Sequence, residues 1–285
     1  MRILITGAGG QLGRDLQRAL STHDLLPLTR QQLDITDADG VAGALAAFGP
    51  EAVVHAAALT DTTRCEREPV FAYEVNATGA ANVARSCAAS GAAMVYVSTN
   101  EVFDGTNKQP YLEDDRARAV NAYGRSKLEG ERFVREAFAS HYIVRTAWLY
   151  GHGGDNFPAK VLRSPASGDL TGVTDEVATP TYTRDLSEAI AALLTTAAYG
   201  VYHFTNAGEA SRYDWMMEIL RLAGREDIAV RPVTTADFRA SLKPDAVVPE
   251  KPPYSVLVNN RGAALGIRLR PWKEALAEYL VGSPA

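Results

Sequence analysis

Residues 1–13 read MRILITGAGGQLG, a short apolar run that passes directly into glycines. The run RILIT is typical of a buried strand, and Gly7, Gly10 and Gly13 follow it at intervals of three residues. Glycines at a junction between a strand and a helix permit a tight turn and a close approach of the backbone to a pyrophosphate, whose charge faces the amides of the helix N-terminus. We therefore expect a dinucleotide-binding loop at the start of the chain.

Strand-like and helix-like segments alternate after this loop through the first half of the chain. The strand-like runs are almost continuously apolar, which is typical of parallel strands buried on both faces. In order they are RILIT, LLPLT, AVVHAAA, AMVYVST and YIVRTAW, and the helix candidates between them are GQLGRDLQRAL, TDADGVAGALAAF, PVFAYEVNATGAANVARSCAAS and NAYGRSKLEGERFVREAF. This pattern predicts an α/β fold with a doubly wound parallel sheet of the Rossmann type.

The pattern changes near residue 150, where loops rich in Gly, Pro and Thr begin. We expect residues 1–150 to form the dinucleotide-binding domain and residues 151–285 to form mainly a smaller α/β substrate-binding lobe, with some segments returning to the first domain. In SRYDWMMEILRLAG, Ser211 is a candidate N-cap, and Trp215 and Ile219 lie on a face expected to pack in a core. The proline-rich loop KPDAVVPEKPPYS is expected to cross the mouth of a cleft.

Composition and charge exclude several kinds of partner. The 285 residues carry a formal net charge of −5 and no basic run, so neither a nucleic acid polymer nor a membrane surface is an expected partner. No signal peptide or transmembrane run is recognisable, and Cys65 and Cys87 lack the spacing of a disulfide framework, which together favour a cytoplasmic protein with reduced thiols. The five histidines lack the spacing of a metal site, so no metal ligands are predicted among them.

The end of the second predicted strand indicates which dinucleotide is bound. An acidic residue there would bind the ribose 2′-hydroxyl, but LLPLTRQQ offers Arg30, whose guanidinium suits a 2′-phosphate. NADPH is therefore favoured over NADH, which stays possible. The alternative for Arg30 is a solvated surface side chain.

A catalytic set is predicted from three further residues. Tyr123 and Lys127 are four apart in the helical segment NAYGRSKLEGE, so they share one face, and Thr99 ends the fourth predicted strand. An adjacent ammonium and an oxidised nicotinamide would favour the phenolate of this tyrosine and lower its pKa. Asn76 is a candidate further member, with helix kinking or core hydrogen bonding as the alternative.

At these residues the chain resembles the dTDP-4-dehydrorhamnose reductase family within the extended short-chain dehydrogenase/reductases. The resemblance runs almost from end to end, through GAGGQLG, QLDITD, AAALT, VFDG after Ser98 and Thr99, NAYGRSKLEGE, RTAWLYG, DNF, PTYTRDL, GVYHFTNAGEASRYDW and YSVLVN. It implies NADPH-dependent reduction of a nucleotide-linked 4-keto-6-deoxy sugar to dTDP-L-rhamnose or a related product. Hydride would go to C4, and Tyr123 would donate the proton.

The resemblance also implies site residues. Lysine at position 127 would hold the nicotinamide ribose and lower the Tyr123 pKa, while Thr99 would bind the carbonyl oxygen. The cofactor would be bound by Gly7, Gly10, Gln11 and Leu12 at the pyrophosphate, Arg30 at the 2′-phosphate, Asp34 and Ile35 near the adenine, and Ala58, Leu59, Thr60, Tyr123 and Lys127 towards the nicotinamide. The substrate would contact Thr99, Asn100, Glu101, Tyr123 and Trp148. Core packing of Trp148 and a strand-end cap at Thr99 are the alternatives.

The chain departs from the family pattern on the substrate side. Asn100 and Glu101 replace an Asp-Tyr pair, Glu176 and Ala178 replace Gln and Gly, and Lys251 stands where Arg-Pro is common. A Thr-Asp-Glu segment would be typical of a sugar-nucleotide 4,6-dehydratase, in which the Asp is an acid. A carboxamide has no readily transferable proton, so Asn100 favours reduction, with Asn100 and Glu101 expected to contact the sugar.

Three alternatives remain open at the level of the sequence. The chain could be a non-catalytic NADP-binding regulatory subunit, or another extended short-chain sugar-nucleotide enzyme such as an epimerase or dehydratase. Some members of the family also pair as homodimers through carboxylates and Mg²⁺, and Asp15, Asp185 and Glu278 are candidates for this role.

Overall fold

A six-stranded parallel sheet forms the centre of the computed structural model, which describes residues 1–164 and 170–282. The strands lie in the order β10-β5-β4-β3-β1-β2, and each neighbouring pair is parallel. Their bounds are β1 Arg2–Thr6, β2 Asp24–Leu28, β3 Ala52–His55, β4 Ala93–Thr99, β5 His141–Thr146 and β10 Gly200–His203. The predicted α/β fold with a doubly wound sheet is confirmed.

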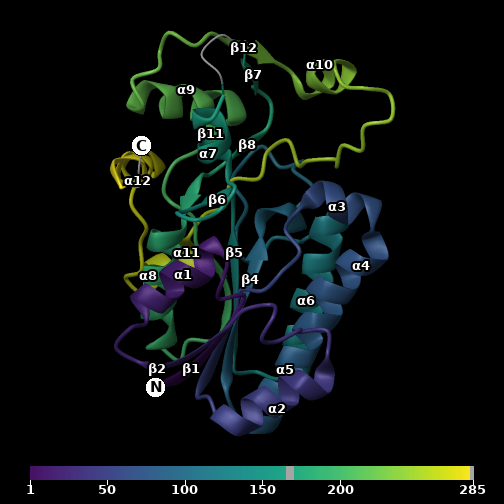
Figure 1. Ribbon diagram of the computed structural model, residues 1–285, viewed down its shortest axis with the longest axis vertical. Helices are drawn as coiled ribbons and strands as arrows, with labels where there is room; N and C mark the ends of the chain where they lie inside the picture. Colours follow the sequence, from purple (N-terminus) through teal and green to yellow (C-terminus); the bar gives the residue numbers. More distant parts are fainter. Residues whose placement is uncertain (165–169, 283–285) are drawn as a thin grey trace.

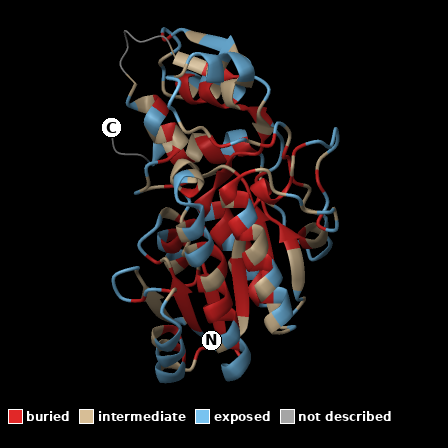
Figure 2. Ribbon diagram, turned by 90° about the vertical axis from the view of Figure 1, so that its right-hand side faces the viewer, coloured by how far each residue is buried: buried red, intermediate tan, exposed pale blue. Residues whose placement is uncertain are grey.

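Helices cover both faces of this sheet (Figure 1). One face carries α1 (Gln11–Ala19) and α8 (Thr183–Leu194), and the other carries α2 (Ala38–Phe48), α5 (Gly79–Ser90) and α6 (Ala122–Ala137). The strands between them are buried along nearly their whole length, as the red ribbon in Figure 2 shows. Pro27 lies in β2 at the edge of the sheet, where the N–H that proline lacks is tolerated.

The strand order reverses between β1 and β3, since the chain first runs outward to β2 and then returns to the other side of β1. Such a reversal leaves a crevice at the carboxyl ends of the strands, where open α/β sheets bind ligands. The loops after β1, β3 and β4 all open into this crevice.

The second half of the chain builds a small lobe above the sheet, and it also contributes α8 and β10 to the large lobe (Figure 1). The small lobe consists of α7 (Phe157–Leu162), α9 (Arg212–Leu222), α10 (Thr235–Ala240), α12 (Trp272–Val281) and three two-stranded sheets. These sheets pair β6 (Leu149–Tyr150) with β9 (Thr181–Tyr182), β7 (Leu170–Val173) with β12 (Val230–Val233), and β8 (Val177–Ala178) with β11 (Ala210–Ser211). A separate aromatic core that includes Trp215 and Ile219 holds the lobe together.

The remaining helices are short and lie around the crevice or beside β10. They are α3 (Thr62–Arg67), α4 (Pro69–Tyr73), the π-helical η1 (Glu74–Thr78), the 3-10 turn η2 (Asn100–Val102) and α11 (Asn260–Ala264). The predicted N-cap Ser211 forms a capping box with Asp214 at the start of α9. None of the helices in the described part of the chain has the length and apolar character needed to cross a bilayer.

Candidate active site

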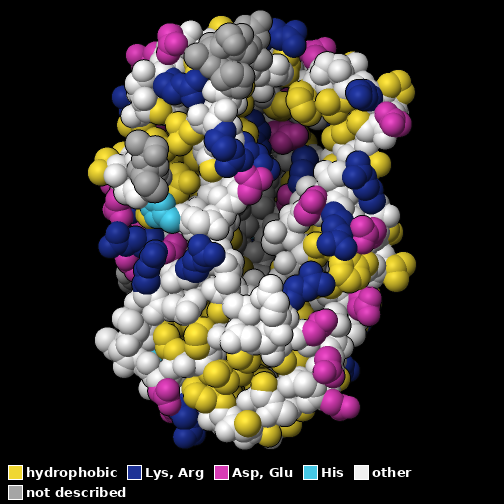
Figure 3. Space-filling model, viewed as in Figure 1, with side chains coloured by type: hydrophobic (Ala, Val, Ile, Leu, Met, Phe, Trp, Pro, Cys, Tyr) yellow, Lys and Arg dark blue, Asp and Glu magenta, His cyan; other side chains and the backbone are white. Residues whose placement is uncertain are grey.

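A cavity of about 900 Å³ lies between the sheet and the small lobe. Figure 3 shows the molecule hollowed near its middle, with charged side chains of both signs around the opening. Apart from the candidate Asn76, the residues expected to serve the cofactor, the substrate or catalysis all line this cavity: Gly7, Gly10, Gln11, Leu12, Arg30, Asp34, Ile35, Ala58, Leu59, Thr60, Thr99, Asn100, Glu101, Tyr123, Lys127 and Trp148. The fold therefore brings together segments that lie far apart in the sequence.

Two glycines of the loop between β1 and α1, Gly7 and Gly13, have no room for a side chain. Gly7 has a φ of 71°, and a Cβ placed on it would lie 2.7 Å from the backbone nitrogen of Ala57. A Cβ on Gly13 would lie 2.3 Å from the Gly7 carbonyl oxygen, so α1 packs directly against the loop. Gly10 occupies the N-cap position of α1, whose first amides face the cavity. A small anionic group fits such an N-terminus.

Arg30 lies just after β2, exposed on the rim of the cavity. Asp34 lies near it and accepts hydrogen bonds from the Thr36 amide (3.0 Å) and hydroxyl (2.8 Å). These hydrogen bonds, with the Arg30 charge, lower the pKa of Asp34. The rim therefore carries the Arg30 guanidinium near the Asp34 carboxylate, which already accepts hydrogen bonds from Thr36.

Asn76 lies behind the cavity, within the π-helical turn η1, and is fully buried. Its side chain bonds both backbone groups of Leu59, with the Leu59 amide donating at 2.8 Å and the Leu59 carbonyl accepting at 3.0 Å. It also donates to the Ser126 hydroxyl on α6 at 3.0 Å. Asn76 thus positions the loop after β3, which makes it a supporting residue outside the cavity lining.

Helix α6 carries Tyr123 and Lys127 into the cavity. Its N-cap is Asn121, whose side-chain oxygen accepts from the Gly124 amide at 2.7 Å. Lys127 is buried, and its ammonium lies 4.1 Å from the centroid of the Tyr96 ring. Burial lowers the pKa of Lys127 to about 7, against an opposing effect of Glu131.

The expectation that Lys127 lowers the Tyr123 pKa differs from what the structure shows. Burial raises the pKa of Tyr123, the Glu101 carboxylate raises it further, and a hydrogen bond with Thr99 opposes both. The Lys127 ammonium lies over the Tyr96 ring and is not among the main influences on Tyr123. The physical reason is that desolvation disfavours the phenolate more than any neighbouring cation stabilises it. Tyr123 is consequently a neutral phenol, the form that donates a proton.

Thr99 ends β4 and starts a chain of polar contacts. Its hydroxyl donates to the Asn100 side-chain oxygen (3.2 Å), and the Asn100 amide group donates to the Ser255 hydroxyl (2.7 Å). All three side chains are buried. Asn100 is therefore anchored on both sides, and its amide supplies hydrogen bonds but no transferable proton.

Glu101 pairs with Lys251, a residue from the predicted proline-rich loop. The ammonium lies 2.8 Å from one carboxylate oxygen and 3.1 Å from the other, and it also donates to the Thr62 hydroxyl at 3.1 Å. The side chains are only 11% (Glu101) and 21% (Lys251) exposed, so the pair is largely desolvated. Two of the departures from the family pattern therefore contact each other.

The small-lobe wall of the cavity is aromatic. Trp148 has a φ of 44°, unusual for a residue with a side chain, and its ring stacks on that of Trp215 with centroids 5.5 Å apart. Phe157 also stacks on Trp215, with ring centroids 4.7 Å apart. Trp215 was expected to pack in a core; it belongs to the small-lobe core and also lines the cavity. Its indole N–H has no hydrogen-bond partner among the described residues.

Arg212 is a cavity residue that the sequence analysis missed. Its guanidinium lies 3.6 Å from the centroid of the Trp148 ring and 3.8 Å from the Glu176 carboxylate. Burial lowers the pKa of Arg212 to about 10, while Glu176 and Glu101 act in the opposite direction. The only signal available was its position one residue after the Ser211 N-cap, where a charged side chain is usually solvated.

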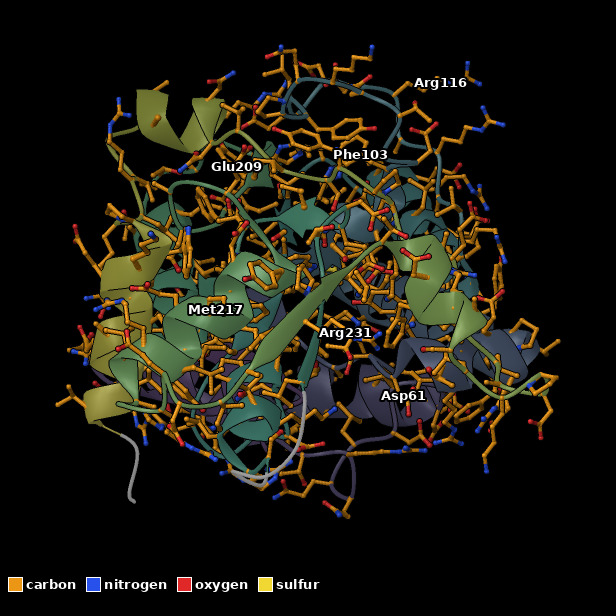
Figure 4. The ribbon with its side chains drawn as sticks, turned by 90° about the horizontal axis from the view of Figure 1, so that it is seen from above. Asp61, Phe103, Arg116, Glu209, Met217 and Arg231 are labelled. Carbon is orange, nitrogen blue, oxygen red and sulfur yellow. The ribbon has the colours of Figure 1, made fainter. Side chains whose placement is uncertain are left out.

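Seen from above (Figure 4), Met217 of the same helix lies on one side of the view and Asp61, before α3, on the other.

The three carboxylates considered for Mg²⁺ do not gather into a metal site. Asp15 pairs with Arg18 (2.8 Å) and accepts from the Thr183 hydroxyl, while Asp185 and Glu278 both pair with Arg270 at 2.8 and 2.6 Å. Among residues 1–164 and 170–282, no group of three or more His, Cys, Asp or Glu side chains is arranged to hold a metal ion. Arginine therefore neutralises these carboxylates, and the Mg²⁺ alternative is not supported. Cys65 and Cys87 are both free and buried.

Comparison with known proteins decides the family. The family model described as RmlD substrate binding domain matches residues 1–283. The chain belongs to this family. Among its RmlD relatives, the dTDP-4-dehydrorhamnose reductase of Streptomyces griseus is 41% identical over 97% of this chain and 92% of its own length. The spore coat polysaccharide biosynthesis protein SpsK of Bacillus subtilis is 38% identical over 98% of this chain and 96% of its own.

Solved structures of the RmlD family agree with this assignment. The dTDP-4-dehydrorhamnose reductase of Bacillus anthracis, in complex with NADP, has a TM-score of 0.93 and 35% sequence identity, with 99% of both chains covered. The family resemblance inferred from the sequence is confirmed.

Proposed function

We propose that this chain is an NADPH-dependent reductase of a nucleotide-linked 4-keto-6-deoxy sugar, with dTDP-4-dehydrorhamnose as substrate and dTDP-L-rhamnose as product. The observation that carries the proposal is that Thr99, Tyr123 and Lys127 line the same cavity as the glycine loop. A cofactor held by the loop and a substrate beside Trp148 would therefore meet at Tyr123. The dTDP-4-dehydrorhamnose reductases among the relatives support the same reaction.

The residues present fit NADPH. Gly7 and Gly13 leave no space for a Cβ, and Gly10 carries no side chain at the N-terminus of α1, so a pyrophosphate can approach the backbone there. Arg30 on the rim suits a 2′-phosphate, and Lys127 lies where it would hold the nicotinamide ribose. When bound, the cofactor supplies the hydride that the protein's own side chains cannot provide.

The protein's own side chains supply the proton and stabilise the charge that develops on the sugar oxygen. Tyr123 donates it from its hydroxyl to the alkoxide that develops at C4 of the sugar, and its raised pKa keeps it protonated before that step. With substrate bound, the Thr99 hydroxyl exchanges its hydrogen bond to Asn100 for one to the carbonyl oxygen and so stabilises the developing charge. Asn100 and Glu101 contact the sugar, and Trp148 packs against it.

The alternative enzyme in the same fold, a 4,6-dehydratase, needs an acid where Asn100 stands. A carboxamide anchored between Thr99 and Ser255 can only orient a ligand. A regulatory subunit without activity would need a damaged catalytic set, whereas all three residues are present. Reduction is therefore the proposal that these residues support best, ahead of dehydration and epimerisation.

The test uses two reactions with the purified chain. One contains dTDP-glucose and NAD⁺, and the other contains dTDP-4-dehydrorhamnose and NADPH. We expect loss of NADPH absorbance and formation of dTDP-L-rhamnose in the second reaction only. A keto sugar formed in the first reaction, with no oxidation of NADPH in the second, would replace the proposal with the dehydratase. No product in either reaction, with NADPH binding retained, would favour the regulatory subunit.

We also propose a cytoplasmic location and a homodimer, both on the basis of the family resemblance. Since the carboxylates considered for metal bridging are paired with arginines, we propose that any dimer forms without Mg²⁺. Sedimentation velocity with and without EDTA tests this, and dissociation by EDTA would contradict it.

A further inference from the structure

Three positions at which the chain departs from its family pattern lie close together, two of them, Glu101 and Lys251, in the cavity lining. Glu101 follows β4, Glu176 precedes β8, and Lys251 comes from the proline-rich loop. Glu101 and Lys251 form an ion pair, and Glu176 pairs with Arg212 at 3.8 Å. The four side chains also influence one another electrostatically, because both Lys251 and Glu101 affect the Glu176 pKa. They form one charge-balanced cluster, two carboxylates with two cations, on the substrate side.

Asn121 connects the ion pair between Glu101 and Lys251 to helix α6. This N-cap residue donates one hydrogen bond to the Glu101 carboxylate (2.6 Å) and another to the Glu250 carbonyl (2.7 Å), while its side-chain oxygen caps α6. Gly124 packs so closely on the same turn that a Cβ would lie 2.1 Å from the Glu101 carbonyl oxygen. Tyr123 lies between these two contacts in the sequence, so Glu101 and Lys251 are fixed relative to its side chain.

Residues 250–255, which we call the strap, join both lobes at this point. On the large lobe, Lys251 bonds Glu101 and Thr62, and Ser255 accepts from Asn100. On the small lobe, the backbone of the strap pairs with Val177 through two hydrogen bonds of 2.8 Å. The strap is therefore held on both sides of the cavity, and Lys251 is its charged contact with the catalytic side.

We propose that Lys251 is a positioning residue that acts on Tyr123 through Glu101: its ammonium pairs with this carboxylate and balances its negative charge near the tyrosine hydroxyl. This inference rests on the proposed reductase function. Without the ammonium, Glu101 would be a desolvated negative charge near the phenol, and such a charge makes the phenol a weaker proton donor. The titratable groups facing Glu101 and Tyr123 are Lys251, Arg212, Glu176, Cys65, Tyr96 and Lys127.

The experiment compares Lys251→Met, Glu101→Gln and the double variant with the wild type. We expect Lys251→Met to lower kcat about 10-fold or more, and the double variant to recover most of the loss, because a neutral Gln leaves no unpaired charge and still accepts from Asn121. Lys243→Met is the matched control, since Lys243 is exposed on the same loop and outside the cavity lining, and it should keep wild-type kcat.

A pH profile separates this role from a purely structural one. In the reverse direction, oxidation of the product with NADP⁺, Tyr123 must accept a proton, so activity rises with pH. Lys251→Met should move this rise to higher pH, and the double variant should return it towards the wild-type position. If Lys251→Met folds poorly, Lys251→Arg keeps the charge and should retain kcat within about threefold.

Two outcomes would overturn the inference. One is a kcat for Lys251→Met within twofold of the wild type, and the other is a double variant no more active than Lys251→Met. Failure of the proposed function is distinct, because it appears as a wild type that does not reduce the keto sugar. In that case thermal unfolding still tests the pair: Lys251→Met should have a lower Tm than the double variant, and the reverse order would reject the charge pairing.

Discussion

At the scale of the residue, Tyr123 is the side chain on which the proposed chemistry depends most. Replacing it with Phe removes the proton donor but keeps the ring that packs in the cavity wall. We expect Tyr123→Phe to reduce kcat by about 10²- to 10⁴-fold, the usual range for a general acid, while NADPH binds as in the wild type. Steady-state turnover and fluorescence titration measure the two quantities. Tyr73→Phe, exposed on α4, is the control, and near-normal turnover of Tyr123→Phe would remove the assignment.

Arg30 is the residue that should set cofactor preference. Its guanidinium lies exposed on the cavity rim, where a 2′-phosphate would add a charge-assisted contact that NADH lacks. We expect Arg30→Asp to lower kcat/KM with NADPH at least 10-fold more than with NADH. Arg116→Asp, at an exposed position outside the cavity lining, should change neither. Equal losses with both cofactors would leave Arg30 as a surface side chain.

At the scale of the element, a buried ion pair fixes helix α6 to strand β5. Glu131 is fully buried and binds Arg145 through two hydrogen bonds of 2.9 and 2.8 Å, with further bonds from Ser98 and Arg135. Burial acts to raise the Glu131 pKa, but Arg145 and the other donors outweigh it and lower the pKa. This carboxylate therefore stays ionised one turn beyond Lys127 on α6, the helix that also carries Tyr123.

We predict that Glu131→Gln costs about 3–5 kcal/mol in the free energy of unfolding, because it leaves the Arg145 guanidinium buried without its counter-charge. Urea unfolding followed by circular dichroism measures this. Glu129→Gln is the matched control on the same helix, since Glu129 pairs with Arg132 at the surface, and it should cost about 1 kcal/mol or less. Similar values for the two variants would show that the buried pair contributes no more than a surface pair.

Local sequence patterns predicted the first five strands, the helices between them and a group of the residues that line the cavity, for an identifiable reason. The glycine spacing after β1 and the Tyr-Lys spacing on α6 are short-range signals that the backbone itself imposes. The position of Arg212 in the cavity has no such short-range signal. Neither has the contact between Lys251 and Glu101, because 150 residues separate these two partners in the sequence. The same applies to the Tyr123 pKa, which depends on burial by the whole fold.

At the scale of the whole molecule, two buried histidines tie stability to pH. Burial lowers the pKa of both His55 and His203 from 6.5 to about 3, with Lys127 and Arg145 respectively acting in the same direction. Between pH 3 and 6.5, these two histidines bind protons in the unfolded chain but not in the folded chain. Stability is therefore complete above about pH 6.5 and is lost as the pH falls towards 3.

We expect the free energy of unfolding to fall by roughly 2.7 kcal/mol per pH unit within this window, the effect of two protons. His203→Asn should reduce that slope by about one proton, or about 1.4 kcal/mol per pH unit. Urea unfolding at several pH values between 4 and 7 measures both slopes. An unchanged slope in the variant would mean that His203 binds its proton equally in the two states.

Because β10 comes late in the sequence, the sheet stays incomplete for part of the time during which the chain is synthesised. Strand β5 ends at Thr146, but its outer neighbour β10 is not complete until His203. At synthesis rates of about 5–20 residues per second, the nascent sheet keeps an open, apolar edge for roughly 3 to 11 s. During that interval other nascent chains could pair with β5, so we expect fragments that end before residue 200 to aggregate during translation, whereas the full chain closes its own edge.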